Sequence, residues 1–187
     1  MNIHIHTSRL LIRNLSDGDL LDFYAYRSNP EVTKYQSFDV MTLDQSDEFI
    51  QDQKDQPFGD PGEWTQYGIE QKSNAKLIGD CAIKLDAYDA RIAEIGITIS
   101  HQAQKKGYAK EAFMGILDFL FNRCGVHRVV EYADVENTAS NCLLKSLGFR
   151  LEGHLIESLF VKGKWINEYQ YAMLKREWDK LYSHHKN

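Results

Sequence analysis

A strand, a short glycine-containing loop and a long amphipathic helix follow one another in the middle of the chain. Arg91–Ile99 alternates in polarity as a half-buried strand does, and Tyr108–Asn122 carries one broad apolar stripe at helical spacing. Arg128–Asp134 has the composition of a further strand. Two strands joined through such a helix must run parallel, because the helix returns the chain to its starting edge. A parallel strand pair is therefore predicted.

Strand and helix signals on both sides of this unit define the expected fold class. Helices are expected from Asp17 to Asn29-Pro30, over Leu43–Gln53 and over Asn137–Leu147. Other strands are expected at Leu10–Arg13, Trp64–Glu70, Leu77–Leu85, Phe149–Val161 and Lys164–Leu174. The order predicts an α+β fold, a mixed sheet of about seven strands flanked by helices. The length of 187 residues suits a single domain, 1–187, with a core at 7–175 and a C-terminal helix and polar tail at 176–187.

Charge and cysteine content narrow the function classes. The formal net charge of -5 disfavours nucleic-acid binding, which depends on a basic surface. Cys81, Cys124 and Cys142 form no CxxC pair, which suits a reducing compartment, and Cys142 is expected to be a buried packing residue. No signal peptide or membrane-spanning run is evident, so the expected location is cytoplasmic and no membrane partner is expected. The histidines lack metal-ligand spacing, and no metal is expected.

The loop that opens the Tyr108–Asn122 helix has the features of an anion site. Its residues are Gln104, Lys105, Lys106, Gly107, Tyr108 and Ala109. A helix N-terminus leaves about four backbone N–H groups unpaired and carries roughly half a positive charge, and a glycine lets an anion approach closely. The GxxxxGK[ST] and GxGxxG phosphate loops are excluded, because Tyr108 follows the glycine and the other glycines are absent. Taken alone, the loop is better explained as a surface turn with a glycine at the helix start, because such helix starts are common.

At this loop the chain resembles the GNAT superfamily of acyl-CoA-dependent N-acetyltransferases. Gln104, Gly107 and Ala109 match the [Gln/Arg]-x-x-Gly-x-[Gly/Ala] loop of that superfamily in full. The resemblance implies the GNAT fold with a splayed parallel pair, and acetyl-CoA as co-substrate with its pyrophosphate on the loop amides. The cofactor-binding residues it implies are Ile97, Thr98, Ile99, Gln104, Lys105, Lys106, Gly107, Tyr108, Ala109 and Asn137.

Other segments resemble the RimJ/RimL-like branch, which acetylates protein N-termini. Asn137–Asn141 followed by Leu143–Phe149 is similar to its Asn-x-x-Ser…Lys-x-Gly-Phe signature. Thr7–Arg13 near the start, and Tyr171–Leu174 with Glu177-Trp178 near the end, are also similar to this branch. The resemblance therefore covers nearly the whole chain.

Acetyl transfer to an amine needs a proton acceptor, a polarised thioester and a proton for the thiolate. Glu94 is the candidate base, because placing a carboxylate between the apolar residues Ala93 and Ile95 is costly and so favours a functional role. The alternative is a solvated or salt-bridged strand residue. The resemblance implies an oxyanion site of main-chain N–H groups near Ile97 to Ile99. It also implies that Ser140, acting through water, replaces a tyrosine that many relatives carry where Leu144 stands here.

Asn137 is expected to cap its helix and, by resemblance, to bond the pantetheine arm. The resemblance implies that the first helices and the final hairpin frame the acceptor groove, with Tyr35 and Trp165 as the aromatic residues nearest the acceptor. The acid-rich stretch from Asp39 to Glu63 would attract a cationic amine, although a solvated surface explains most of these acids.

The expected acceptor is an amine: a peptide N-terminus, or a small molecule such as a polyamine or an antibiotic. The alternative from another class is a non-catalytic acyl-CoA-binding module, which would keep the loop but need no base. The expected state is monomer or homodimer.

Overall fold

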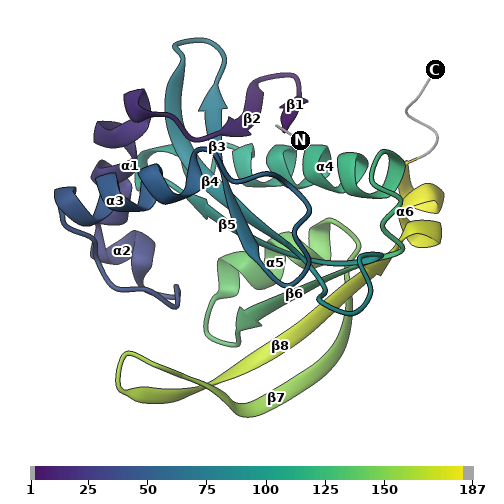
Figure 1. Cartoon of the computed structure of the whole chain (residues 1–187). Coiled ribbons are helices and arrows are strands. Elements are labelled where there is room, and N and C mark those ends of the chain that lie inside the picture. Colours follow the sequence, from purple (N-terminus) through teal and green to yellow (C-terminus); the bar gives the residue numbers. More distant parts are fainter. Residues whose placement is uncertain (1–2, 183–187) are drawn as a thin grey trace.

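A computed structural model describes residues 3–182 and contains one eight-stranded sheet with helices packed against it (Figure 1). The strands are β1 (His4–His6), β2 (Leu10–Asn14), β3 (Trp64–Gln71), β4 (Lys76–Leu85), β5 (Ile92–Ile99), β6 (Arg128–Asp134), β7 (Arg150–Val161) and β8 (Lys164–Leu174). The helices are α1 (Leu20–Arg27), α2 (Pro30–Thr33), α3 (Leu43–Gln53), α4 (Tyr108–Asn122), α5 (Thr138–Ser146) and α6 (Lys175–Tyr182), with 3-10 turns at η1 (Asp17–Asp19) and η2 (His101–Ala103). Within residues 3–182, no helix has the length and apolar character that crossing a bilayer requires.

The sheet is mixed, as predicted, with strand order β1-β2-β3-β4-β5-β6-β8-β7. Its one parallel pair within residues 3–182 is β5 with β6, and the register of this pair ends where Glu94 lies opposite Val130. Beyond that pair the two strands separate. We call the opening between Ile95–Ile99 and Glu131–Asp134 the fork.

Alternation along the strands gives the sheet two differently occupied faces. Cys81, Ile95 and Val129 belong to the main buried cluster, together with α4 and α5 side chains. Asp80, one residue before Cys81, points to the opposite face, where it forms an ion pair of 2.7 Å with Arg27 of α1. We call these the α4 face and the α1 face.

Helix α4 forms the centre of the α4 face and follows the predicted apolar stripe. Its inward side chains are almost completely buried, namely Ala112, Phe113, Ile116, Leu117 and Leu120. Burying a large apolar side chain of this kind contributes roughly 1.5–3 kcal/mol. The helix therefore has a fixed position relative to β5, and so does the loop at its N-terminus.

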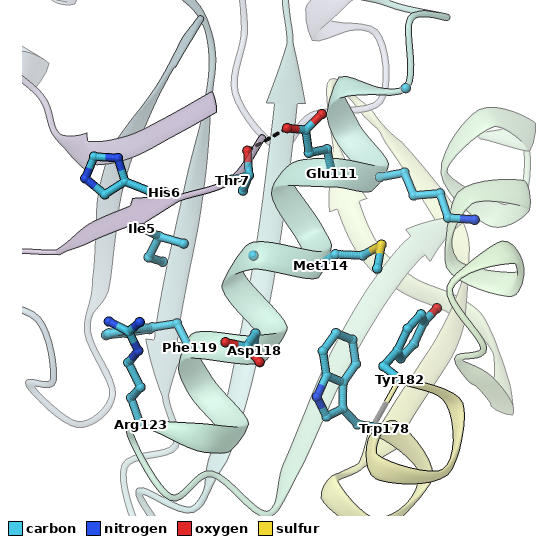
Figure 2. Close-up of a pocket in the computed structure, with 13 residues that line it drawn as sticks. Ile5, His6, Thr7, Glu111, Met114, Asp118, Phe119, Arg123, Trp178 and Tyr182 are labelled. Atoms are coloured by element: carbon cyan, nitrogen blue, oxygen red, sulfur yellow. Dashed lines mark hydrogen bonds between the residues drawn. The ribbon is translucent and has the colours of Figure 1, made fainter. Parts of the chain in front are cut away.

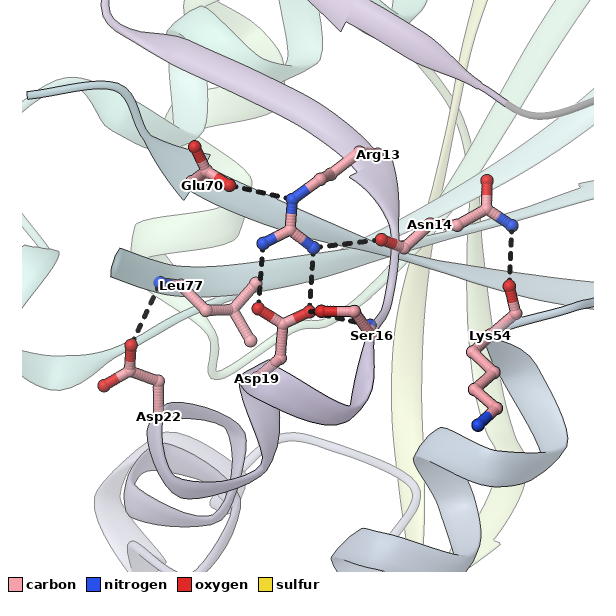
Figure 3. Close-up of polar contacts among 8 residues, drawn as sticks. All are labelled: Arg13, Asn14, Ser16, Asp19, Asp22, Lys54, Glu70 and Leu77. Atoms are coloured by element: carbon pink, nitrogen blue, oxygen red, sulfur yellow. Dashed lines mark hydrogen bonds and ion pairs between the residues drawn. The ribbon is translucent and has the colours of Figure 1, made fainter. Parts of the chain in front are cut away.

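A polar network holds the start of α1 against the sheet (Figure 3). Arg13 on β2 donates through Nη1 and Nη2 to the two carboxylate oxygens of Asp19 at 2.7 and 2.8 Å, and through Nε to Glu70 on β3 at 2.8 Å. The backbone N–H of Leu77 donates to Asp22 at 3.2 Å. Bidentate Arg–carboxylate pairs fix orientation as well as distance, so α1 is held in one position against β2–β4.

The long β7–β8 hairpin extends from the sheet toward α2 (Figure 1). Near its turn, the Nζ of Lys162 donates to the backbone oxygen of Thr33 at 2.6 Å. The hairpin register shifts between Leu155 and Leu159, and Glu157 there has a positive φ of 48°. The bend in β7 and the contact with Thr33 connect the hairpin to α2 across the α1 face.

The structure adds to the predicted elements and corrects some of them. The short edge strand β1 was not predicted, because only Ile5 among its three residues is buried. Pro30 does not simply end the first helix; α1 ends at Arg27, and Pro30 starts α2. The expectation that Cys142 is buried was wrong, since it is exposed while Asn141 and Leu144 occupy the inner face of α5. The predicted C-terminal helix is α6, and the polar tail at 183–187 lies outside the described residues.

Candidate active site

A cleft of about 620 Å³ opens at the fork. Its walls come from β5, β6, α2, the loop before α4, the start of α5 and the β7–β8 hairpin. The predicted site residues that line it are Tyr35, Glu94, Ile97, Thr98, Ile99, Gln104, Lys105, Gly107, Tyr108, Ala109, Asn137 and Ser140. Lys106 and Trp165 do not line it.

The loop before α4 has a backbone that few sequences could adopt. Gly107 is the N-cap of α4 with φ 80° and ψ 3°, and Lys105 also has a positive φ of 60°. Successive turns of this kind direct neighbouring N–H groups into a concave surface that suits an anion. The Nε2 of Gln104 donates to the backbone oxygen of Ile99 at 3.1 Å and so ties the loop to the end of β5.

Arg9 stabilises the loop through contacts made outside the cleft. Its Nε donates to Glu111 in the first turn of α4 at 2.6 Å, and its Nη1 donates to the backbone oxygen of Lys106 at 3.1 Å. The guanidinium also lies 4.4 Å from the centre of the Tyr108 ring. Lys106 thus contributes its carbonyl to the loop's support, while its side chain is outside the cleft.

The backbone of β5 presents polar groups to the fork. The N–H of Ser100 donates to Ile78 on β4 at 2.9 Å, so strand alternation directs the N–H groups of Thr98 and Gly96 to β4 as well. The N–H groups of Ile97 and Ile99 therefore point toward the fork. Donors that are fixed before a reaction begins stabilise a developing oxyanion without reorganisation.

Glu94 lines the cleft on the α1 face and is also ion-paired. Its carboxylate lies 2.7 Å from the Nζ of Lys84, and the two side chains are 26% and 27% exposed. The Lys84 ammonium in turn lies 4.5 Å from the centre of the Trp64 ring. The structure thus contains the salt bridge that the alternative interpretation expected, at a position where Glu94 still reaches the cleft.

A second carboxyl group in the cleft, Glu131 on β6, was missed from the sequence. It is only 7% exposed, and burial followed by the nearby charge of Glu94 raises its pKa well above the ordinary glutamate value. The sequence did carry a signal: Glu131 follows Val129 and Val130 in a buried strand, as Glu94 follows Ala93. The rule that singled out Glu94 applies equally here.

The start of α5 closes the cleft on the α4 face. Asn137 caps the helix, as predicted, with its Oδ1 accepting from the N–H of Ser140 at 3.1 Å. Asn141 donates to the backbone oxygen of Asp134 at 3.0 Å and accepts from the hydroxyl of Tyr171 at 2.9 Å. Leu144 is completely buried in the core. The hydroxyl-bearing Ser140 and the cap are thereby fixed beside the fork.

The wall on the α1 face combines aromatic and acidic groups from separate segments, namely Glu31, Tyr35, Trp64, Tyr132 and Glu168. Trp165 is 58% exposed and packs on Phe160 instead, while its neighbour Ile166 lines the cleft. Strand alternation explains this difference, because adjacent residues of β8 face opposite ways. None of the acidic residues from 39 to 63, all within the described chain, lines the cleft.

A separate cavity of about 520 Å³ runs along the outer side of α4 (Figure 2). Much of its apolar lining comes from Met114, Trp178 and Tyr182. At its upper end the hydroxyl of Thr7 donates a hydrogen bond to the carboxylate of Glu111. Gly107 is the one predicted site residue among those that line it within residues 3–182. In the same described range, no group of three or more His, Cys, Asp or Glu side chains is arranged to hold a metal ion.

Comparisons with known proteins agree with this geometry. The family model for the acetyltransferase (GNAT) domain matches residues 9–150. The chain is 33% identical over 177 residues to the uncharacterized N-acetyltransferase p20 of Bacillus licheniformis, covering 93% of this chain and 97% of the relative. Among solved structures, a GNAT-family acetyltransferase from Bacillus anthracis matches with a TM-score of 0.84 and 25% identity, covering 93% of this chain and 99% of the other. Spermidine N-acetyltransferase from Vibrio cholerae, in complex with CoA and spermine, matches with a TM-score of 0.77 and 25% identity, covering 91% and 98%.

Proposed function

Because the chain belongs to the acetyltransferase (GNAT) domain family, we propose that it transfers the acetyl group of acetyl-CoA directly to a primary amine. One observation carries this proposal. A single cleft is lined by the left-handed loop at Gly107, by Ile97, whose N–H points to the fork, and by the carboxylate of Glu94. An anion site, an oxyanion donor and a proton acceptor are the groups that acyl transfer to an amine requires.

The donor side would hold acetyl-CoA through groups of this chain. The loop N–H groups at Gly107, Tyr108 and Ala109 would bind the pyrophosphate, and Asn137 would bond the pantetheine arm. Acetyl-CoA supplies an activated thioester, whose carbonyl the N–H of Ile97 would polarise. The concave loop and the volume of the cleft support this assignment.

Glu94 would accept the proton that the amine loses as it attacks. Alkylammonium groups titrate near 10, so at neutral pH an amine arrives charged and needs such an acceptor. The ion pair with Lys84 does not prevent this, because both side chains are about one quarter exposed and an incoming ammonium can replace the lysine.

The acidic lining favours an acceptor that carries positive charge. Glu31, Glu94 and Glu168 surround the α1 side of the cleft with Tyr35 and Trp64, and aromatic faces as well as carboxylates attract alkylammonium groups. A polyamine fits this lining, and the similarity to a spermidine acetyltransferase supports it. A protein N-terminal α-amine is the second acceptor class, supported by the RimJ/RimL-like segments.

An acceptor screen with acetyl-CoA tests the proposal by following thiol release. Its arms are spermidine, peptides with a free or a blocked N-terminus, and a lysine-containing peptide. Acetyl-CoA should also raise the melting temperature of the wild type by binding the native state. The variant Gly107→Glu should abolish that shift, while Gly125→Glu, at an exposed turn with a similar φ of 72°, should retain it.

Absence of a melting shift in the wild type would refute the assignment of the donor site. A shift without thiol release in any arm would favour a non-catalytic acyl-CoA-binding module instead. Release only with free-α-amine peptides would assign the acceptor to protein N-termini.

A further inference from the structure

We propose that Glu131 is a catalytic acid that gives its proton to the sulfur of CoA as the thioester breaks. This role rests on the proposed acetyl transfer. It supplies the one proton that transfer to an amine requires and that Glu94, as proton acceptor, does not provide.

The position of Glu131 in the fold is the first argument. The last registered pair of the parallel strands is Glu94 with Val130, so Glu131 is the first residue of β6 beyond it. Its side chain lines the cleft together with Ile97, Asn137 and Ser140. The carboxyl group therefore lies at the point where the fork begins, next to the backbone that would polarise the thioester.

The two carboxyl groups of the fork belong to opposite faces of the sheet. Residues opposite one another in a strand pair project to the same face, so Glu94 shares the α1 face with Val130. Glu131 lies two residues from both Val129 and Ala133, so its side chain projects to the same face as theirs, which belong to the core beneath α4 and α5. Glu94 is thus on the acceptor side, and Glu131 is on the side of the loop and α5, from which the donor would enter.

The environment of Glu131 favours the neutral form of its carboxyl group. The residue is 7% exposed, and within residues 3–182 no hydrogen bond or ion pair joins its carboxyl to another group. Burial raises its pKa, and the negative charge of Glu94 adds to that effect. A carboxyl group that is largely buried and has no ion-pair partner is costly to ionise, so its presence in a cleft favours a function there.

Among residues 3–182, the other groups on the α4 face of the fork are less suitable acids. Leu144 is apolar and buried, and a serine hydroxyl such as that of Ser140 is a weak proton donor. Tyr171, opposite Glu131 on β8, already donates its hydroxyl proton to Asn141. The titratable groups beside Glu131 are then Glu94 on β5 and Tyr171 on β8, and of the two only Glu94 contributes to its raised pKa.

An acceptor that arrives as an alkylammonium first loses one proton to solvent, and from the neutral amine the step balances with the two carboxyl groups. The amine nitrogen bonds to the carbonyl carbon, and the carbon–sulfur bond breaks with its electron pair on sulfur. Glu131 gives its proton to that sulfur, and the carboxylate of Glu94 takes the proton from nitrogen. The cycle closes when the proton on Glu94 passes through the fork to Glu131.

Kinetics of matched variants test the role. Glu131→Gln keeps the shape of the side chain but cannot deliver a proton, and it should lower kcat by about 10²–10⁴-fold with an unchanged Kd for acetyl-CoA. It should also remove the alkaline fall of the kcat–pH profile, which Glu94→Gln should retain. Glu48→Gln on the outside of α3 is the control with wild-type kinetics.

A measurement on the free protein makes the test independent of turnover. The infrared difference spectrum between wild type and Glu131→Gln should contain the C=O band of a protonated carboxylic acid at neutral pH, and alkaline titration of the wild type alone should remove that band. If titration of the wild type to alkaline pH removes no carboxylic-acid band, the proposal is overturned, and this result holds even if Glu131→Gln folds poorly.

The outcomes separate the two proposals. A wild type that releases no thiol with any amine refutes acetyl transfer, and the acid role falls with it. An active wild type whose Glu131→Gln variant keeps kcat and the alkaline limb refutes the acid role alone.

Discussion

Replacing Gly107 with alanine tests whether the left-handed loop is the conformation that binds the anion. Gly107 has φ 80° and ψ 3° at the cap of α4, and a Cβ there would lie 3.4 Å from Nη2 of Arg9, which is tolerable contact. The cost of Gly107→Ala is therefore mainly conformational, roughly 1–2 kcal/mol for a residue with a Cβ in this region. Because Gly107 is exposed, the free loop can relax to a negative φ and turn its N–H groups away.

Binding must then restore the strained loop, and 1–2 kcal/mol corresponds to an acetyl-CoA Kd about 5–30-fold higher than that of the wild type. Isothermal titration with acetyl-CoA measures this directly. Gly125→Ala is the matched control, since Gly125 has φ 72°, meets nothing within 4 Å of an added Cβ and lies after α4, away from the cleft. It should lose comparable stability and keep the wild-type Kd. A Kd for Gly107→Ala within about twofold of the wild type would refute the reasoning.

Two further perturbations follow from side chains outside the cleft. Arg9→Ala removes the contacts that hold the loop and should weaken acetyl-CoA binding. It should also lower the melting temperature by about 2–4 °C, the effect of roughly 1 kcal/mol. The control is Arg91→Ala, which should leave the Kd unchanged because the 74% exposed side chain of Arg91 pairs within its own turn. The guanidinium groups of Arg128 and Arg150 lower the pKa of Glu152 from 4.5 to about 2, so this carboxylate stabilises the fold above pH 4.5 and the contribution is lost as pH falls toward 2. Thermal melts of Glu152→Gln should therefore decline less steeply than those of the wild type across that interval; parallel declines would contradict this.

The loop before α4 and the start of α5 could be placed from the sequence because each is continuous in the chain. Gln104 to Ala109 form one turn, and Asn137 and Ser140 belong to one helix start, so spacing alone brings their groups together. The parallel pair followed from the order of elements, since a strand–helix–strand unit has one sensible topology. Local rules sufficed wherever the functional groups belong to one element.

The sequence was least informative where strand alternation or long-range pairing decides which side chains face the cleft. Trp165 and Ile166 are adjacent on β8, so they project to opposite faces and only one of them can face the cleft. The sequence of the hairpin does not determine which one does, because β7 shifts register between Leu155 and Leu159. Glu131 was missed because its meaning depends on where the register of β5 and β6 ends. The pairing of strands that are distant in sequence sets that point.

The acceptor side depends on contacts that no local pattern encodes. Its groups come from α2, from the first residue of β3 and from the final hairpin, and the contact between Lys162 and Thr33 brings the first and last of these together. A one-residue change in the hairpin turn would move Glu168 relative to Glu31 without altering the loop at Gly107 or the fork. Binding of the donor can therefore stay constant while the acceptor changes. If the proposed function holds, similar chains with the same loop would act on different amines, because the loop would bind the acetyl donor while the charges on the α1 face would select the acceptor.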